Sequence, residues 1–246
     1  MRTIGFMSIL YGKEYLKESL LSIRDHVEKM VVAYTKNPSH GQRVKEECPD
    51  TEQEIHDICK DVLGDKFIWH RSERFNSEAE HRGIRYTYAQ GYDLILTIDA
   101  DEVFKEDEIQ GALNYAYNNK ERYYGIKGYV NFWRSFDYCC LDGFRPIRIE
   151  NLNNNNQLQN HECPLTIYHF STAQSEPILR YKMKAFGHAS ELRKNWIDGI
   201  YYAWTPENDI QDIHPVAFGL WNSIKFDKTT LPDYLKAHPN YNKTLI

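Results

Sequence analysis

The chain has 246 residues, 41% of them hydrophobic and 26% charged, which is the balance of an ordinary soluble protein with a sizeable core. Its formal net charge of −5 leaves no basic footprint, which argues against binding to a nucleic-acid backbone. No apolar run reaches the roughly 18 residues of a membrane span, and the first residues do not form a secretory signal. The five cysteines form no C-x-x-C pair. We therefore expect reduced thiols in a cytoplasmic protein, in the host cytoplasm if the chain is viral.

Strands and helices alternate through the first hundred residues. Apolar, β-branched runs predict strands at 3–10, 29–34, 66–70 and 93–99. Helices between them are predicted from apolar spacing over 16–27, from a capping box at Thr51 and Glu54, and from another at Ser77 and Glu80 whose helix ends near Gly91. Strands separated by helices predict a parallel sheet, whose ligands bind beyond the carboxyl ends of the strands.

The pattern changes after residue 105. A helix is predicted over 106–118, an aromatic-rich strand and turn over 122–138, an Asn-rich loop over 151–160, a strand over 164–171 and a helix over 176–195. No repeat and no linker separates these segments. We therefore expect a single domain with two halves, 1–105 and 106–246.

The run LILTIDADEVF, residues 94–104, ends a buried strand in the acids Asp99, Asp101 and Glu102. Because residues i and i+2 of a strand point to the same side, Asp99 and Asp101 should project together and repel each other. A divalent cation would relieve that repulsion, and hard oxygen ligands suit Mg²⁺ or Mn²⁺. The alternative is that one acid caps the next helix while the others are solvated.

An apolar strand that ends in D-x-D-x-(T/V) also resembles the first motif of the haloacid-dehalogenase-like phosphatases, which would make Asp99 a phospho-aspartate. That motif normally opens its domain, whereas almost a hundred residues precede it here. No Asp-Asp or GDxxxD element follows. The phosphatase is therefore kept as an alternative.

Four segments, in order, are similar to the GT-A fold family-two glycosyltransferases, especially their simple bacterial and phage members. They are IGFMSILYGKEYLKESLLSIRDHVEKMVVAY, EAEHRGIRYTYAQGYDLILTIDADE, NHECPLTIYHFS and RYKMKAFGH, within roughly 3–35, 78–104 and 161–188. The resemblance implies an α/β fold of the GT-A, Rossmann-like type, with a mixed, mainly parallel sheet flanked by helices. It also implies a nucleotide-sugar-binding half, 1–105, that ends in the D-x-D motif, and an acceptor-binding half, 106–246.

The function expected from these features is a metal-dependent, inverting glycosyltransferase that moves a sugar from a nucleoside-diphosphate sugar to an acceptor hydroxyl. A cation held by carboxylates would stabilise the charge that grows on the departing diphosphate. Asp101 is the predicted direct ligand of Mn²⁺ or Mg²⁺, with Asp99 on the metal, its water or the ribose, and Glu102 in support. The resemblance implies His169 as a further metal ligand, although a buried core histidine is the alternative. Inversion needs a base, for which Glu162 is the first candidate and Asp142 the second.

Nucleotide-binding residues are expected after the first two strands and in the helix before the D-x-D. They are Tyr11, Gly12, Thr35, Arg82 and Asp99. Many family members place an acid after the second strand, whereas this chain has AYTKNPSHG there. Lys182 and Lys184 could neutralise the leaving group or form a solvated helix face, and His188 is a weaker metal candidate. Phe132, Trp133, Phe136 and Tyr138 could line an acceptor groove or pack in the core.

Donor and acceptor remain open at this point. A UDP-sugar is the first expectation for the donor, and a glycan, a lipid-linked sugar, a protein side chain or a modified nucleobase could accept the sugar. A non-catalytic carbohydrate-binding protein on a transferase fold is the third hypothesis, because the missing acid leaves room for it.

Overall fold

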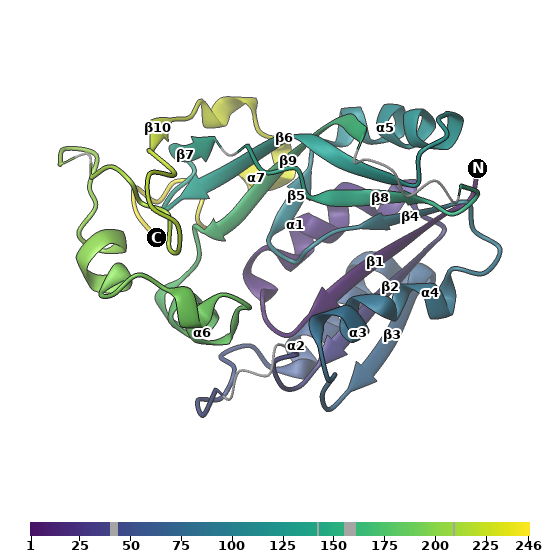
Figure 1. Cartoon of the computed structure of the whole chain (residues 1–246), viewed down its shortest axis with the longest axis horizontal. Helices are drawn as coiled ribbons and strands as arrows, with labels where there is room; N and C mark the ends of the chain where they lie inside the picture. Colours follow the sequence, from purple (N-terminus) through teal and green to yellow (C-terminus); the bar gives the residue numbers. More distant parts are fainter. Residues whose placement is uncertain (40–43, 142, 155–160, 209) are drawn as a thin grey trace.

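Four parallel strands form one half of the sheet (Figure 1). The computed structural model describes residues 1–39, 44–141, 143–154, 161–208 and 210–246. In the first half it contains β1 (Thr3–Ile9), α1 (Lys13–Ile23), η1 (Arg24–His26), β2 (Lys29–Thr35), α2 (Glu52–Leu63), η2 (Gly64–Lys66), β3 (Phe67–Ser72), α3 (Glu78–Gly83), α4 (Arg85–Tyr88) and β4 (Leu94–Thr97). The strand order β4-β1-β2-β3 shows that the chain reverses direction across the sheet between β1 and β4, which is where α/β sheets bind ligands.

Apolar residues alternate between the two faces of β1 and bury both. Met7 and Ile9 belong to the same cluster as Leu16 and Leu20 of α1, and this cluster also includes residues of α2 and α5. Ile4 and Phe6 pack on the opposite face, against which Ile84 and Tyr88 lie. Successive side chains of β1 point to opposite faces of the sheet, and apolar side chains from helices cover both faces, as expected for a parallel sheet between helices.

The second half extends the same sheet with mostly antiparallel strands. It contains β5 (Glu102–Phe104), α5 (Glu106–Asn118), β6 (Tyr123–Trp133), β7 (Tyr138–Leu141), β8 (Ile147–Asn151), β9 (His161–Thr172), α6 (Glu176–Ala185), η3 (Ala189–Glu191), η4 (Ile197–Tyr201), β10 (Ile224–Lys225), η5 (Lys228–Thr230) and α7 (Asp233–Lys236). β8 joins the halves, because it pairs antiparallel with β4 and with β6. β9 runs parallel to β6 and pairs antiparallel with β5, directly after the D-x-D.

The predicted fold class is confirmed: the sheet is mixed, with the parallel strands β1 to β4 on one side, and it is flanked by helices. The capping box at Thr51 forms, with Glu54 N–H donating to Thr51 Oγ1 and Thr51 N–H to Glu54 Oε2. All five cysteines are free, and none of the helices in the described residues is long and apolar enough to cross a membrane.

Several expected elements have different bounds. The helix expected from Ser77 to near Gly91 is split into α3 and α4, and the helix expected over 176–195 ends at Ala185. The Asn-rich loop was placed too early, because Asn151 is buried at the end of β8 and donates to Ala116 O. Residues 155–160 of that loop lie outside the described residues.

Candidate functional site

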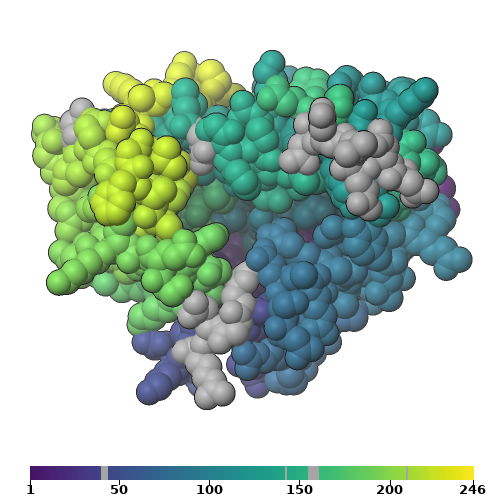
Figure 2. All heavy atoms as spheres, viewed as in Figure 1, coloured from purple at the N-terminus to yellow at the C-terminus, as the bar shows by residue number. Residues whose placement is uncertain are grey.

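A pocket of about 490 Å³ lies at the carboxyl ends of β1, β2 and β4. Residues 8–12 at the end of β1, Thr35 and Ser39 at the end of β2, and residues 99–101 after β4 line it. Figure 2 shows the face on which it opens, hollowed between the blue atoms around α3, the teal atoms around β6 and β8, and the green atoms around α6. The pocket therefore lies where the strand order reverses.

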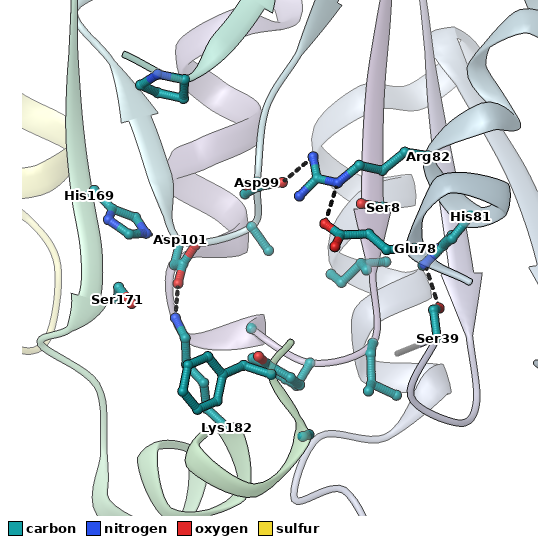
Figure 3. Close-up of a pocket in the computed structure, with 18 of the residues that line it drawn as sticks. Ser8, Ser39, Glu78, His81, Arg82, Asp99, Asp101, His169, Ser171 and Lys182 are labelled. Carbon is teal, nitrogen blue, oxygen red and sulfur yellow. Dashed lines mark hydrogen bonds and ion pairs between the residues drawn. The ribbon is translucent and has the colours of Figure 1, made fainter. Parts of the chain in front are cut away.

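Seven of the nine predicted site residues line this one pocket. They are Tyr11, Gly12, Thr35, Arg82, Asp99, Asp101 and His169. Figure 3 shows that Asp99 and Arg82 lie between two sides of the pocket, with His169 and Lys182 on one side and Ser39 and His81 on the other. The fold thus brings together residues that are up to 158 positions apart in the sequence (Tyr11 and His169).

Asp99 faces two arginines. Arg148 Nη2 donates to Asp99 Oδ2 over 2.7 Å, and Arg82 Nη1 lies 3.8 Å from Asp99 Oδ1. Burial by itself raises the pKa of Asp99, but Arg148 and Arg82 outweigh it and lower this pKa below its ordinary value. Asp99 is therefore ionised, and its charge is balanced by cations of the chain.

Arg148 also holds Glu102, the third acid of the motif. Glu102 is fully buried, and its carboxylate accepts hydrogen bonds from Arg148 Nε and Nη2 and from Tyr129 OH. Glu102 Oε2 also accepts from Asp99 N–H over 3.1 Å. Glu102 thus supports the motif, as expected from the sequence. Arg148 was missed, because its position in β8 carries no sequence signal that pairs it with acids 46 and 49 residues away.

Asp101 is held between Lys182 and His169. Lys182 Nζ lies 2.6 Å from Asp101 Oδ2, and Gln174 Nε2 donates to the same oxygen over 3.0 Å. Burial raises the pKa of Asp101, but the ammonium group of Lys182 outweighs burial and lowers this pKa to well below its usual range. His169 Nε2 faces the other oxygen, Oδ1, at 3.7 Å.

The neighbours of His169 define its protonation. Its Nδ1 lies 2.6 Å from Asn131 Oδ1, which can only accept, so Nδ1 carries the proton. Burial lowers the pKa of His169, more than the nearby carboxylates raise it. A neutral ring then directs the Nε2 lone pair at Asp101 Oδ1, and two electron-pair donors that face each other at 3.7 Å can share a cation.

The turn between β1 and α1 is fixed from outside by Asp50. Gly12 N–H and Lys13 N–H donate to Asp50 Oδ2 over 2.7 and 3.0 Å, so this carboxylate caps α1. Gly12 has φ 118°, and a Cβ there would come within 2.9 Å of Ala100 Cβ. Only glycine fits this left-handed turn beside the D-x-D. Tyr11, which follows β1, packs edge to face on Tyr181 of α6.

Buried hydroxyl groups form the side of the pocket near β2 and α3. Ser39 Oγ lies 2.9 Å from His81 Nδ1, and His81 Nε2 lies 2.7 Å from Ala33 O. Thr35 Oγ1 donates to Asn37 O over 2.7 Å. The sequence offered Thr35 as a binding residue, but Ser39 and His81 were not singled out.

The two predicted catalytic bases are not in this lining. Glu162 lies at the start of β9, with 54% of its side chain exposed and Arg145 at 3.2 Å. It is seven residues before His169 on the same strand, which corresponds to about 23 Å. The role of Glu162 as the base therefore stays a prediction from the sequence. Asp142 lies outside the described residues.

Other candidates are placed away from the pocket. His188 pairs with Glu191 at the surface, and Lys184 is paired with Glu46. Phe132, Trp133 and Phe136 are fully buried, so they pack in the core and do not line an acceptor groove. In the described part of the chain, no group of three or more His, Cys, Asp or Glu side chains is arranged to hold a metal ion.

Comparison with protein-family models found no match, and comparison with curated protein sequences found none. Among solved structures, the chain is similar to S. aureus TarS 1–349 (15% identity, TM-score 0.38, 52% of this chain and 36% of that one). The same TarS fragment in complex with UDP gives 16% identity, a TM-score of 0.39 and the same coverage. Its complex with UDP-GlcNAc gives 16%, 0.38, and coverage of 52% and 34%. The chain thus spans about a third of the length of these structures, and its function is argued from its own residues.

Proposed function

We propose that this protein is a glycosyltransferase of the GT-A type that uses a nucleoside-diphosphate sugar. The observation that carries the proposal is the pocket at the reversal of strand order. It holds the D-x-D acids, Asp99 and Asp101, and three cations, Arg82, Arg148 and Lys182, on side chains from four different elements. Its volume of about 490 Å³ is in the ordinary range for sites of small molecules, about 300–1,000 Å³.

The charges in the pocket suit a leaving diphosphate. Breaking the bond between the sugar and the diphosphate places negative charge on the phosphate oxygens, and fixed cations stabilise that charge as it develops. Arg82 and Lys182 both line the pocket, and each presents N–H groups next to an acid of the motif. An arginine fork and an ammonium group are both established partners of phosphate oxygens.

A charge count supports a further cation. The three acids of the motif, Asp99, Asp101 and Glu102, face Arg82, Arg148 and Lys182, and Arg82 is also paired with Glu78. A diphosphate would add negative charge that these side chains, already paired, balance only in part. Asp101 Oδ1 and His169 Nε2, which face each other at 3.7 Å, would hold Mn²⁺ or Mg²⁺. A bound cation would supply Lewis-acid stabilisation of the leaving group. Asp99 would then serve the ribose or a metal-bound water rather than the metal directly, because Arg148 occupies its Oδ2.

Binding of nucleoside diphosphates tests the proposal without knowledge of the acceptor. UDP is the first probe, followed by GDP, ADP and CDP, each titrated by calorimetry with and without Mn²⁺. We expect one nucleotide to bind in a Mn²⁺-dependent way and the Asp101→Asn variant to lose that dependence. If no nucleotide binds under any condition, the proposal is wrong, and the result favours a non-catalytic carbohydrate-binding protein.

No specific observation favours the phosphatase. It would need a second acidic pair from a later strand beside Asp99, but the acids that line the described pocket are Glu78, Asp99 and Asp101. Trapping of a phospho-aspartate analogue with beryllofluoride at Asp99 would reverse this preference.

A further inference from the structure

The segment that joins β9 to α6 is bonded to the first turn of α1. Ser175 N–H donates to Glu14 Oε2 over 2.8 Å, and Ala173 O accepts a hydrogen bond from Tyr15 OH. The Tyr15 ring is fully buried and stacks on Phe170 of β9, with the ring centroids 4.4 Å apart. Because α1 begins directly after the turn that lines the pocket, these contacts connect that turn with the start of α6.

The carboxylate of Glu14 lies at the N-termini of two helices. Glu14 belongs to the first turn of α1, and it accepts from the backbone of Ser175, which is the N-cap residue of α6. Ser175 forms no side-chain cap of its own with the described residues. Negative charge is favourable at a helix N-terminus, because the free N–H groups there carry partial positive charge. One side chain therefore stabilises both helices in a single relative arrangement.

The other oxygen of Glu14 binds the segment that follows α7. Asn240 Nδ2 donates to Glu14 Oε1 over 2.6 Å, and His238 Nε2 lies 2.9 Å from Glu14 O. Asn240 and His238 are both buried, and the His238 ring stacks on Tyr15 with the centroids 4.5 Å apart. Glu14 thus joins three segments that are distant in the sequence: α1, the start of α6 and the residues after α7.

Lys182 lies two turns further along α6 and enters the pocket. Its Nζ lies 2.6 Å from Asp101 Oδ2 (Figure 3). Seven positions separate it from Ser175, which corresponds to about 10 Å along a helix. Gln174, directly before Ser175, donates to the same oxygen of Asp101 over 3.0 Å. A shift of the start of α6 would therefore move both donors relative to the D-x-D.

We infer that Glu14 is a positioning residue of the pocket, because it fixes α6 relative to the β1–α1 turn and so holds Lys182 against Asp101. Glu14 itself is not among the residues that line the described pocket. It would act on a ligand through α6 and not by contact. The effect on a nucleotide-sugar donor rests on the proposed function, whereas the link between Glu14 and Lys182 is a property of the fold.

Acetylation of Lys182 measures this link without a ligand. Brief treatment with N-hydroxysuccinimidyl acetate modifies accessible lysines, and peptide mass spectrometry gives the rate at each one. The Lys182 side chain is 12% exposed, whereas that of Lys184 on the same helix is 53% exposed. We expect Glu14→Ala to raise the rate at Lys182 about tenfold, because α6 loses an attachment and opens locally more often. The rate at Lys184, the internal control, should change less than about twofold.

Conservative changes at Glu14 and Asn240 test whether these particular bonds matter. Glu14→Gln keeps an oxygen for Ser175 N–H, and its amide can donate to Asn240 once the Asn240 amide is turned over. Lys182 should then react within about twofold of the wild-type rate. Asn240→Asp places a second carboxylate against Glu14, and the repulsion should expose Lys182. Addition of Glu14→Gln to Asn240→Asp restores a donor and should return the rate to near the wild-type value.

Glu176→Ala is the matched control for the loss of an acid near the start of α6. Glu176 lies in the first turn of α6 and pairs with Arg180 of the same helix. Its removal should leave the rate at Lys182 within about twofold of the wild type. Thermal melts establish that each variant is folded. If Glu14→Ala does not fold, Asn240→Asp and its rescue by Glu14→Gln give the same comparison.

The affinity for UDP in the presence of Mn²⁺, measured by calorimetry, gives the consequence for the site. We expect Glu14→Ala to weaken UDP binding about tenfold, because Lys182 is no longer held beside the D-x-D. Glu14→Gln and Glu176→Ala should bind within about twofold of the wild type.

The two measurements separate this inference from the proposed function. If Lys182 of Glu14→Ala is acetylated at the wild-type rate, or if Glu14→Gln does not rescue Asn240→Asp, the inference is wrong whether or not UDP binds. If Lys182 reacts faster but the affinity for UDP is unchanged, Glu14 holds α6 without positioning the site, and the inference is again wrong. If no nucleotide binds the wild-type protein, the proposed function fails, and acetylation alone decides whether Glu14 holds Lys182 at Asp101.

Discussion

Arg148 is the residue that makes the D-x-D cluster possible in a buried place. It is 8% exposed and is bonded to two carboxylates, Glu102 and Asp99. Coulomb repulsion between these acids would be severe in an interior without it. The negative charge at the end of β4 is therefore balanced within the protein before any ligand binds.

Removing this cation should cost stability. We expect Arg148→Met to lower the free energy of unfolding by about 3–5 kcal/mol, because fully buried Glu102 would keep a charge without a partner. Urea denaturation followed by tryptophan fluorescence measures it. The double variant Arg148→Met, Glu102→Gln removes both charges and should recover at least half of the loss. Equal stability of the single variant and the wild type would show that the pair contributes little.

The base that activates the acceptor is a second residue-scale question. Glu162 lies at the opposite end of β9 from His169, and the second candidate, Asp142, lies outside the described residues. We expect Asp142→Asn to lower the rate of sugar transfer by about 100-fold or more and Glu162→Gln to change it less than twofold. The measurement is the rate of sugar transfer to an acceptor that has first been found by screening. A large loss of rate in Glu162→Gln with little loss in Asp142→Asn would identify Glu162 as the base.

Two elements, the β1–α1 turn and α6, position the pocket residues. Asp50 fixes the turn through Gly12 N–H and Lys13 N–H, although its other oxygen, Oδ1, has no hydrogen-bond partner among the described residues. α6 carries Lys182 and Ala185, and Phe186 follows it directly; all three residues line the pocket.

Asp50 lends itself to a test of stability against pH. Asp50→Ala should lower the free energy of unfolding by about 1–2 kcal/mol through loss of the cap, whereas Asp50→Asn keeps an acceptor. Burial raises the pKa of Asp50 in the folded protein. The folded state therefore holds its proton to higher pH than the unfolded state, and ionisation costs stability as pH rises from 3.8 through the raised pKa. The free energy of unfolding of Asp50→Asn, measured by urea titration, should therefore rise relative to that of the wild type as the pH increases over that interval. If the difference in the free energy of unfolding between Asp50→Asn and the wild type does not change with pH, the pKa of Asp50 is not raised on folding.

Two lysines on α6 give a matched comparison. Lys182 pairs with Asp101 inside the pocket, whereas Lys184 pairs with Glu46 and is 53% exposed. We expect Lys182→Met to reduce kcat for donor cleavage about tenfold or more, with faster hydrogen exchange over 176–185, because the pocket loses a cation and α6 an ion pair. Lys184→Met should change kcat less than twofold. If Lys182→Met and Lys184→Met change kcat to the same extent, Lys182 has no specific role in donor cleavage.

At the scale of the molecule, the features that could be predicted from the sequence are those that depend on local pattern, namely strands and helix starts. The alternation in TIGFMSIL and LILT predicts strands that are buried on both faces, and Thr51 with Glu54 predicts a helix start that the structure confirms. The pairing of β8 with β4 was not predictable, because it joins segments more than fifty residues apart. Arg148 reaches the acids only through that pairing, so the site's main cation was missed with it.

Binding should also stabilise the whole fold. Because the pocket is assembled from β1, β2, β6, β8, β9, α3, α6 and the turn after β4, a ligand that fills it binds only the folded state. A nucleotide present at about 100 times its dissociation constant adds about 2.7 kcal/mol, and for a chain of this length that raises Tm by roughly 5–10 °C. Differential scanning calorimetry with UDP and Mn²⁺ measures the shift, and Asp101→Asn should reduce it. An unchanged Tm at saturating nucleotide would contradict a site built across these elements.

The most direct test of the central claim is release of nucleoside diphosphate from nucleotide sugars, with water or a screened acceptor taking the sugar. Anion-exchange chromatography follows UDP formed from UDP-sugars, and then the products of other nucleotide sugars, with Mn²⁺ present. The account predicts release by the wild-type protein and at least about 100-fold slower release by Asp101→Asn. No release from any nucleotide sugar by the wild-type protein, or an undiminished rate in Asp101→Asn, would contradict it.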